Sequence, residues 1–557
     1  MNFFDFAWST VLRVTNKHYG EIKILLHDDL RYPYLGKDER GYVLHLIKPK
    51  SLNNNYVVFQ GLRFNLQNPT NKKIIWYLFK ASVYHLSLHA LFSDLTVYSK
   101  WARGKQLNLA AYVVSLIEDA IIDKNMKKHF SWMLPEMVYA NVVSYLRMKR
   151  TEELSNDISR AMTSILLKYN LGRIKGEIES DMQVDVEAIT SMLQRISEKP
   201  KVDEKIDYAN KIYDALSIYG QAFEVPSLLH TESHGTNDMF YNDQIPNEKE
   251  IQPLLTEALQ TAGSEHANTL DLENEGEAHR AITSWLEREN SQLKILKEYV
   301  DAGKNTQFED FTFPTEDYAE FQRRKELLGS PVRRILHQLR LLKNVSGEDF
   351  KQESGFVDLQ EAIQVIASKS QRTDIFVREE LQTREDAWSI LIDASHSLNM
   401  FKGEVKGIAL CLAEVARLLI LNQNSWGMYA FNNKFYIIKD FRERYDARVR
   451  ARIGGLNYGG FTYLPDAILL AAQALKGRLE EARVLVVVSD FFPAGYENVE
   501  ERLKEAVKKV ERMGIGIIGI GVNSSAVKRY IRTNCVVENP YDLIKKFTRA
   551  FIEFSAS

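Results

Sequence analysis

The spacing of hydrophobic residues changes several times along the chain, and each change predicts a different kind of structural element. Residues 42–47 and 56–66 alternate between apolar and polar side chains as strands do, and the asparagines at 53–55 between them predict a hairpin. From residue 71 to about residue 173, and again over residues 182–219, apolar positions recur at helical spacing. We therefore expect a small mixed segment with a β-hairpin at residues 1–70, followed by an α-helical domain at residues 71–228.

The middle of the chain has a different composition. Residues 229–280 are polar and markedly acidic, with few large aliphatic side chains. Such a stretch buries too little apolar surface to order itself, so we expect an acidic flexible linker there, with an acidic docking arm as the alternative. Helical spacing resumes over residues 281–299 and 318–342, which predicts a helical connector across residues 281–354.

In the C-terminal part, short apolar runs alternate with stretches of helical spacing. The expected strands are 388–392, 426–431, 435–438, 484–489, 515–520 and 535–537, and the expected helices are 405–421, 464–475, 499–513 and 541–554. Strands that alternate with helices of crossover length form mostly parallel sheets with helices on both faces. The fold class is therefore α/β, with a Rossmann-like domain at residues 355–557 after a largely α-helical N-terminal domain.

Composition narrows the possible functions. A chain of 557 residues exceeds one ordinary domain, and its net charge of −2 indicates neither nucleic acid nor an anionic membrane as a partner. Its two cysteines, Cys411 and Cys535, cannot build a disulfide framework, which fits a reducing compartment. The N-terminus lacks the pattern of a signal peptide, and no apolar run has the length of a membrane span. We expect a cytoplasmic protein with no membrane span.

Oxygen-bearing side chains gather at the ends of two predicted strands. Asp393 ends the first strand, and Ser395 and Ser397 follow at alternate positions; Asp490 ends the strand at 484–489, and Thr462 precedes a helix. Ligands beyond the carboxyl ends of parallel strands share one edge of the sheet. Hard oxygen donors of this kind suit Mg²⁺ or Mn²⁺. A helix or turn cap is the alternative role for each residue taken singly.

In this order, these residues resemble the metal-ion-dependent adhesion site (MIDAS) of the von Willebrand factor A domain. The resemblance implies that Asp393, Ser395, Ser397, Thr462 and Asp490 surround one divalent cation, Mg²⁺ or alternatively Mn²⁺ or Ca²⁺. It also implies a site that grips an acidic residue of another protein and breaks no bond itself. Neutral hydroxyl ligands leave the cation electron-poor, which favours an outside carboxylate as a further ligand.

The C-terminal part is similar, more specifically, to the NorD and CbbO group. The similarity lies in residues 355–359 (Gly-Phe-Val-Asp-Leu), 438–441, 458–462 and 514–521. Members often read Thr-Asp-Gly-x-Pro after the fourth strand, whereas residues 489–493 read Ser-Asp-Phe-Phe-Pro, so the glycine turn is replaced by a bulky pair. The resemblance implies a non-enzymatic adaptor between a MoxR-type AAA+ ATPase and a client metabolic enzyme. A subunit of the metal-chelatase type is an alternative.

A second group of candidate ligands lies in the helical part. His85 and His89 are one helical turn apart, and Glu118 and Asp119 lie on a later helix. Residues 118–123 (Glu-Asp-Ala-Ile-Ile-Asp) partly resemble the Glu-Asp-x-Arg-Ile-Glu helix of the NorD and CbbO group. These four residues could bind a transition metal in a metalloenzyme, or could be hydrogen-bonded core residues or an interhelix ion pair. The sequence has no G-x-x-x-x-G-K-[S/T] motif, so any ATP hydrolysis is expected from a separate polypeptide.

Overall fold

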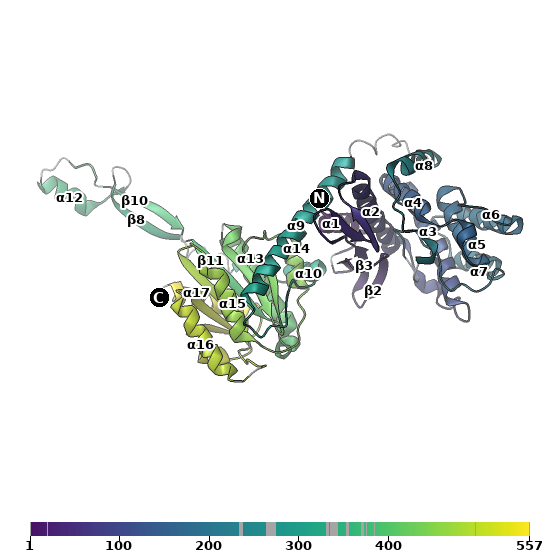
Figure 1. The fold of residues 1–557 in the computed structure, drawn as a ribbon. Helices are drawn as coiled ribbons and strands as arrows, with labels where there is room; N and C mark the ends of the chain where they lie inside the picture. Colours follow the sequence, from purple (N-terminus) through teal and green to yellow (C-terminus); the bar gives the residue numbers. More distant parts are fainter. Residues whose placement is uncertain are drawn as a thin grey trace. The chain divides into compact units, whose positions relative to one another are not determined.

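The computed structural model forms two compact units, Met1–Gln292 and Leu293–Ser557. It describes residues 2–18, 20–232, 238–262, 274–329, 333–334, 344–352, 356–368, 372–374, 376–383, 385–420, 422–495 and 497–555. Figure 1 traces both units along the chain. The two units meet after Gln292, which is later than residue 228, the predicted end of the helical domain.

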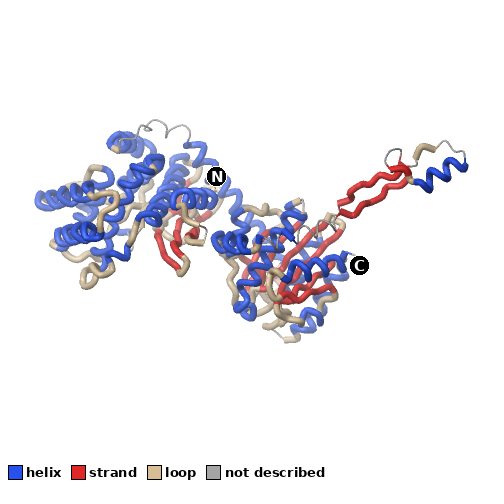
Figure 2. The backbone as a smooth tube through the Cα atoms, turned by 180° about the vertical axis from the view of Figure 1, so that it is seen from behind, coloured by secondary structure: helices blue, strands red, loops and turns tan. Residues whose placement is uncertain are grey.

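The first unit is mainly helical, as predicted (Figure 2). Its helices are α1 (Phe3–Thr15), α2 (Pro69–Phe92), α3 (Leu107–His129), α4 (Leu134–Arg147), α5 (Asp157–Leu171), α6 (Ser180–Arg195), α7 (Val202–Ser217) and α8 (Glu248–Thr261). Helix α2 is central and packs against α1, α3, α4 and strand β3 (Gly41–Ile47). It is buried on nearly all sides, which explains why its apolar residues are not confined to one stripe.

The strands of the first unit pair differently from the predicted hairpin. Strand β3 lies between β1 (Ile22–His27), to which it is parallel, and β2 (Tyr34–Asp38), to which it is antiparallel. A separate sheet contains β4 (Lys50–Ser51), β5 (Tyr56–Phe59) and β6 (Leu62–Asn65). The turn at residues 53–55 therefore joins β5 to the short β4, and β3 takes its partners from earlier in the chain.

Much of the predicted acidic linker at 229–280 is ordered. Helix α8 buries Ile251, Leu255 and Leu259, which lie four residues apart on one helical face. Leu229 and His230 are also buried. Helix α9 (Asn274–Ala302) then begins inside the predicted linker. The remaining linker residues, 233–237 and 263–273, lie outside the described part of the chain.

The second unit is built on a seven-stranded, mostly parallel sheet, which confirms the predicted α/β fold class. The strands are β7 (Asp310–Thr312), β11 (Asp386–Asp393), β12 (Trp426–Phe431), β13 (Lys434–Lys439), β14 (Ala482–Ser489), β15 (Gly516–Val522) and β16 (Thr533–Val537). Their order is β16-β15-β14-β11-β12-β13-β7, and only the β12–β13 pair is antiparallel.

Helices cover both faces of this sheet (Figure 1). One face packs α13 (Lys402–Leu419), α14 (Ala447–Gly454) and α17 (Asp542–Ser555), and the other packs α15 (Leu464–Lys476) and α16 (Val499–Arg512). Alternate residues of β11 supply the two cores, because successive side chains of a strand point to opposite faces. Trp388, Ile390 and Ile392 join the first core, whereas Ala387 and Leu391 join the second.

The predicted helical connector at 281–354 contains strands as well as helices. Strand β7 extends the sheet by pairing with β13, and α10 (Tyr318–Leu327) packs against α13 and α14. Strand β8 (Asn344–Gln352) pairs antiparallel with β10 (Phe376–Thr383), which also pairs with β9 (Phe356–Val357). Helix α12 (Leu359–Ser368) follows β9. The second unit thus begins well before the predicted boundary at residue 355.

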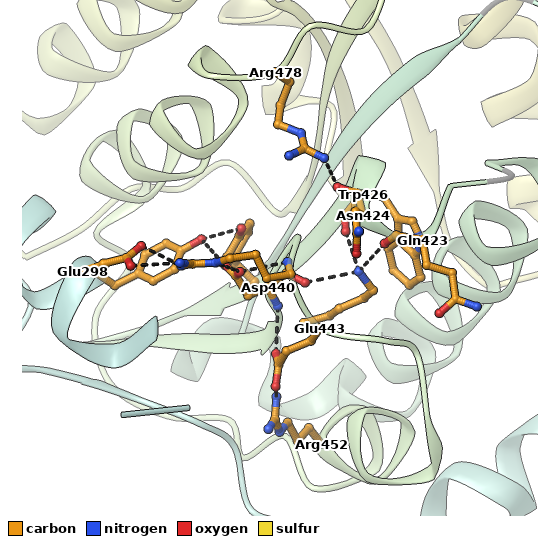
Figure 3. A network of polar contacts seen from close by, with 12 residues as sticks. Glu298, Gln423, Asn424, Trp426, Asp440, Glu443, Arg452 and Arg478 are labelled. Atoms are coloured by element: carbon orange, nitrogen blue, oxygen red, sulfur yellow. Dashed lines mark hydrogen bonds and ion pairs between the residues drawn. The ribbon is translucent and has the colours of Figure 1, made fainter. Parts of the chain in front are cut away.

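The last turns of α9 belong to the second unit and are held there by polar contacts (Figure 3). Arg442 donates to both carboxylate oxygens of Glu298, at 2.8 and 2.6 Å. Tyr299 Oη donates to Asp440 Oδ2 at 3.0 Å and lies 2.6 Å from Tyr429 Oη. Paired, planar bonds of the arginine–carboxylate kind fix geometry as well as adding stability.

A buried lysine lies in the same network. Lys439 Nζ donates to the main-chain carbonyls of Gln423, Trp426 and Asp440 at 2.8, 2.7 and 3.2 Å (Figure 3). Burial lowers the pKa of Lys439 to about 7, although the negative charges of Glu443 and Asp440 act to raise it. A single side chain, Lys439, thus donates hydrogen bonds to three main-chain carbonyls.

Candidate functional site

The two predicted aspartate ligands lie at the same edge of the sheet. Asp393 is the last residue of β11, and Asp490 directly follows β14. These strands are parallel neighbours, with Ile392 opposite Val488. The carboxyl ends of both strands therefore point the same way, and the two side chains emerge from adjacent positions.

Asp393 is fully buried and held at both oxygens. Its Oδ1 accepts a hydrogen bond from Ser395 N at 2.8 Å, and its Oδ2 accepts one from Ser489 Oγ at 2.5 Å. Burial, followed by the nearby charge of Asp490, raises the pKa of Asp393 to about 7. A buried carboxylate whose ionised form is opposed by a second carboxylate nearby is a position where a cation is favourable.

The two predicted serine ligands lie side by side. Ser395 is buried and Ser397 is exposed, and their Oγ atoms are 3.1 Å apart. Adjacent ligands of an octahedral cation with bonds of 2.0–2.1 Å lie about 3.0 Å apart. The spacing of these hydroxyls therefore fits two neighbouring positions around Mg²⁺.

Main-chain hydrogen bonds connect the Thr462 loop to both strand ends. Gly459 N donates to Ala394 O at 2.9 Å, and His396 N donates to Gly460 O at 3.1 Å. On the other side, Ala494 N donates to Thr462 O at 3.2 Å. These bonds place buried Thr462 between the loop that follows Asp393 and the loop that follows Asp490.

All five predicted ligands therefore gather at one edge, in three loops bonded to one another. The donor set contains two carboxylates and three hydroxyls, and its buried members have no cationic side chain among their hydrogen-bond partners in the described residues. Oxygen donors of this type fit a hard divalent cation better than a soft one. A bound cation would supply positive charge to a buried, acidic edge.

In the loop after Asp490, the bulky residue Phe491 adopts a backbone conformation that is typical of glycine. Phe491 has φ of 58°, in the left-handed region that glycine adopts easily, and its ring is only 1% exposed. Phe491 N donates to Ser489 Oγ at 3.0 Å, and Phe492 N donates to Asp490 Oδ1 at 3.1 Å. Phe491 thus occupies a left-handed turn at the cost of backbone strain.

Each of these loops also exposes a large apolar side chain. Met400 is 89% exposed in the segment after Ser397, Phe461 is 53% exposed beside Thr462, and Phe492 is 60% exposed after Asp490. We call these three side chains the apolar rim. Each lies within three residues of a predicted ligand, and only Phe492 stood out in the sequence, as part of the bulky pair at 491–492.

In the helical unit, the structure brings together three of the four candidate ligands. His85, His89 and Asp119 each offer a ligand atom to one small cluster. Glu118 points elsewhere: its Oε1 accepts from Lys205 Nζ at 2.7 Å and from Tyr98 Oη at 2.8 Å. Glu118 and Lys205 therefore form a buried ion pair between two helices, the alternative role that the sequence offered.

The electrostatics of the two histidines differ. Burial and the neighbouring histidines His89 and His230 hold the pKa of His85 well below its ordinary value. Burial also lowers the pKa of His89, but the hydrogen bond and charge of Asp119 outweigh it and raise the pKa overall. His230 was missed because it lies at the start of the predicted linker, where no periodic pattern marks it.

No family model matches the chain. An uncharacterized protein of Pseudomonas aeruginosa is 24% identical over 174 residues, a match that spans 28% of this chain and 28% of that protein. Within the described residues, no helix combines the length and apolar composition required to cross a bilayer.

Proposed function

We propose that this chain is a non-enzymatic adaptor that binds a partner protein through a divalent cation at the edge formed by β11 and β14. Asp393, Ser395, Ser397, Thr462 and Asp490 would hold the cation, with Mg²⁺ as the main candidate and Mn²⁺ or Ca²⁺ as alternatives. The partner would be a MoxR-type AAA+ ATPase, and the client a metabolic enzyme whose activation, remodelling or metal insertion it assists, in the cytoplasm.

One observation carries this proposal. The loops that bear the candidate ligands also bear the apolar rim, so a polar, acidic centre is flanked by exposed apolar side chains. Protein interfaces commonly combine a few central anchors with apolar contacts around them. A partner carboxylate would complete the coordination of the cation while its surroundings cover Met400, Phe461 and Phe492.

The hydroxyl ligands explain why the cation would favour an outside acid. Ser395, Ser397 and Thr462 add no charge, so the cation keeps more of its positive charge than it would with three further carboxylates. The chain itself carries no phosphate-binding loop motif, which assigns ATP hydrolysis to the partner. The predicted adaptor role therefore needs a metal-dependent contact between two polypeptides.

The test is binding between the purified chain and a purified MoxR-type ATPase from the same organism. Titration calorimetry would be run with Mg²⁺ and again with a chelator, for the wild type and for the double variant Ser395→Ala, Ser397→Ala. We expect binding only for the wild type with Mg²⁺. Direct Mn²⁺ binding, followed by electron paramagnetic resonance, would report occupancy of the site independently of the partner.

Two further variants separate the cation from the apolar rim. Phe461→Ser should weaken the complex while Mn²⁺ binding persists, because the exposed side chain of Phe461 adjoins the ligand Thr462 and contributes only contact area. Ser389→Ala, a buried hydroxyl within β11, is the matched control and should change neither measurement. Binding of the ATPase that is equal with Mg²⁺ and with chelator would overturn the metal-dependent role, and no binding in either condition would overturn the adaptor role.

A further inference from the structure

Three ligand atoms meet between α2 and α3 in the first unit. His85 Nε2 and His89 Nε2 are 3.0 Å apart, although both belong to the same helix. Asp119 Oδ1, from α3, lies 3.0 Å from His89 Nε2 and 3.7 Å from His85 Nε2. Both histidines are buried. His85 Nε2, His89 Nε2 and Asp119 Oδ1 therefore form a compact triangle within the helical unit.

Hydrogen bonding alone satisfies this triangle poorly. An imidazole nitrogen either carries a proton and donates or carries a lone pair and accepts. His89 Nε2 lies 3.0 Å from both His85 Nε2 and Asp119 Oδ1. If His89 Nε2 carries a proton, that single proton is shared between two acceptors, and each of the two hydrogen bonds is weak. A cation at the centre instead takes up all three lone pairs at once.

The dimensions of the triangle suit a transition metal. Tetrahedral bonds of 2.0–2.1 Å, as for zinc with histidine and carboxylate, separate neighbouring ligand atoms by about 3.3 Å. The three observed separations, 3.0, 3.0 and 3.7 Å, lie on either side of that value. Two imidazoles and one carboxylate also form the mixed nitrogen and oxygen donor set that zinc accepts.

The surroundings orient the ligands. His89 Nδ1 lies 2.8 Å from Ser93 Oγ, which leaves the opposite ring nitrogen, Nε2, facing the triangle. A metal-bound histidine commonly has such a partner on its second nitrogen. His230 packs edge-on against His85, with ring centroids 5.9 Å apart, and its buried Nδ1 has no hydrogen-bond partner among the described residues.

Two cavities adjoin the cluster. His85, His89 and Asp119 line a cavity of about 460 Å³, and His85, Asp119 and His230 line another of about 260 Å³. Zinc sites that perform chemistry have three protein ligands and an open fourth position, whereas structural sites are closed by four. The cluster has the first arrangement, since its three ligands border space large enough for a small molecule.

We propose that His85, His89 and Asp119 bind a divalent transition metal, with zinc as the best match, and that its open position faces the larger cavity. A water molecule or a small ligand with a free lone pair would occupy that position. This site does not depend on the adaptor function proposed above, because its ligands all come from the first unit. It gives the helical part of the chain a binding function of its own.

The test uses the full-length protein, stripped with a chelator and titrated with Co²⁺ as a spectroscopic substitute for zinc. We expect stoichiometric uptake with the strong visible absorption of four-coordinate Co²⁺, lost on adding Zn²⁺. Asp119→Asn should remove this absorption, because the amide that replaces the carboxylate is a much weaker ligand. Ser93→Ala should weaken metal binding about 10–100-fold, the usual effect of losing a partner of a metal-bound histidine.

Two controls make the result specific. His129→Ala removes an exposed histidine at the end of α3 and should leave the visible absorption of bound Co²⁺ unchanged. Circular dichroism would verify folding, and Asp119→Asn is the decisive variant because it preserves shape at a partly exposed position. Absence of visible absorption in the wild type, or the same absorption in Asp119→Asn, would overturn the proposal.

Discussion

Ser489 Oγ donates a hydrogen bond to Asp393 Oδ2 over 2.5 Å, across the carboxyl ends of two neighbouring parallel strands. The same hydroxyl accepts from Phe491 N at 3.0 Å, so it joins the end of β11 to the turn that follows β14. Ser489 is not among the candidate ligands. It instead fixes the orientation of the carboxylate at the centre of the candidate site.

Ser489→Ala should therefore destabilise the second unit. Removing the hydroxyl leaves Asp393 Oδ2 buried without its donor, which costs about 1–3 kcal/mol. Urea unfolding would measure this change. The control is Ser389→Ala on β11, a hydroxyl that is also buried but lacks a hydrogen-bond partner in the part of the chain that the structure describes. Equal destabilisation by the two substitutions would contradict the prediction.

Substitutions of Phe491 should reveal its backbone strain. Both Phe491→Ala and Phe491→Gly remove a buried ring, a loss of about 3–5 kcal/mol. Glycine adopts φ near 58° without the penalty of about 1 kcal/mol that a side chain carries there. We expect the glycine variant to be the more stable of the two by about that amount in thermal unfolding. An alanine variant as stable as the glycine variant would mean that this turn is not left-handed.

Two adjacent glycines offer a matched test of the Thr462 loop. Gly460 has φ of 78°, and an added Cβ would collide with the Asn433 side chain, whose Oδ1 accepts from Phe461 N at 2.5 Å. A Cβ on Gly459 would have no atom within 4 Å. Gly460→Ala should lower stability by about 1 kcal/mol or more and weaken Mn²⁺ binding, while Gly459→Ala should do neither. Mn²⁺ titration of both variants provides the comparison.

The buried Lys439 predicts a pH-dependent stability difference. Its folded pKa of about 7 lies below the value of about 10.4 for a free lysine, so the unfolded chain binds more protons between these values. The wild type should therefore gain stability relative to Lys439→Met as pH rises from 7 to 10, by up to about 1.4 kcal/mol per pH unit. Below pH 7 the difference should be flat, because both states hold the proton.

Urea titrations of both proteins across this pH range measure that difference directly. Subtracting the variant removes the contribution of other titrating groups. Lys439→Met should also be the less stable protein at high pH, since it leaves the carbonyls of Gln423 and Trp426 without their donor. A constant difference from pH 6 to 10 would contradict the shifted pKa.

The second unit was predictable in outline because its strands are local and strongly patterned. The apolar runs at 388–392 and 484–489 are β11 and β14, and parallel neighbours of this kind bring their carboxyl ends together. Asp393 and Asp490 could therefore be placed at one edge without any knowledge of side-chain contacts. The role of Ser489 was not visible, because a serine that ends a strand carries no signal of the atom it will bond.

The predictions for the first unit failed where strands pair with distant parts of the chain, and where a helix with a narrow apolar face is otherwise polar. Strand β3 takes its parallel partner β1 from some twenty residues earlier, whereas the asparagine turn at 53–55 suggested a partner after it. In α8, Ile251, Leu255 and Leu259 supply a buried face, but the acidic residues around them suggested disorder. The strand β7 is only three residues long and depends on β13 for its pairing.

The apolar rim has a practical consequence for the purified protein. Met400, Phe461 and Phe492 remain in water when nothing covers them, and such side chains on neighbouring loops favour contact between identical molecules. Sulfate strengthens apolar burial, so concentrated solutions of the lone chain should self-associate as that salt is added. Mild detergent should reverse this clustering, and light scattering would follow it from one sample to the next.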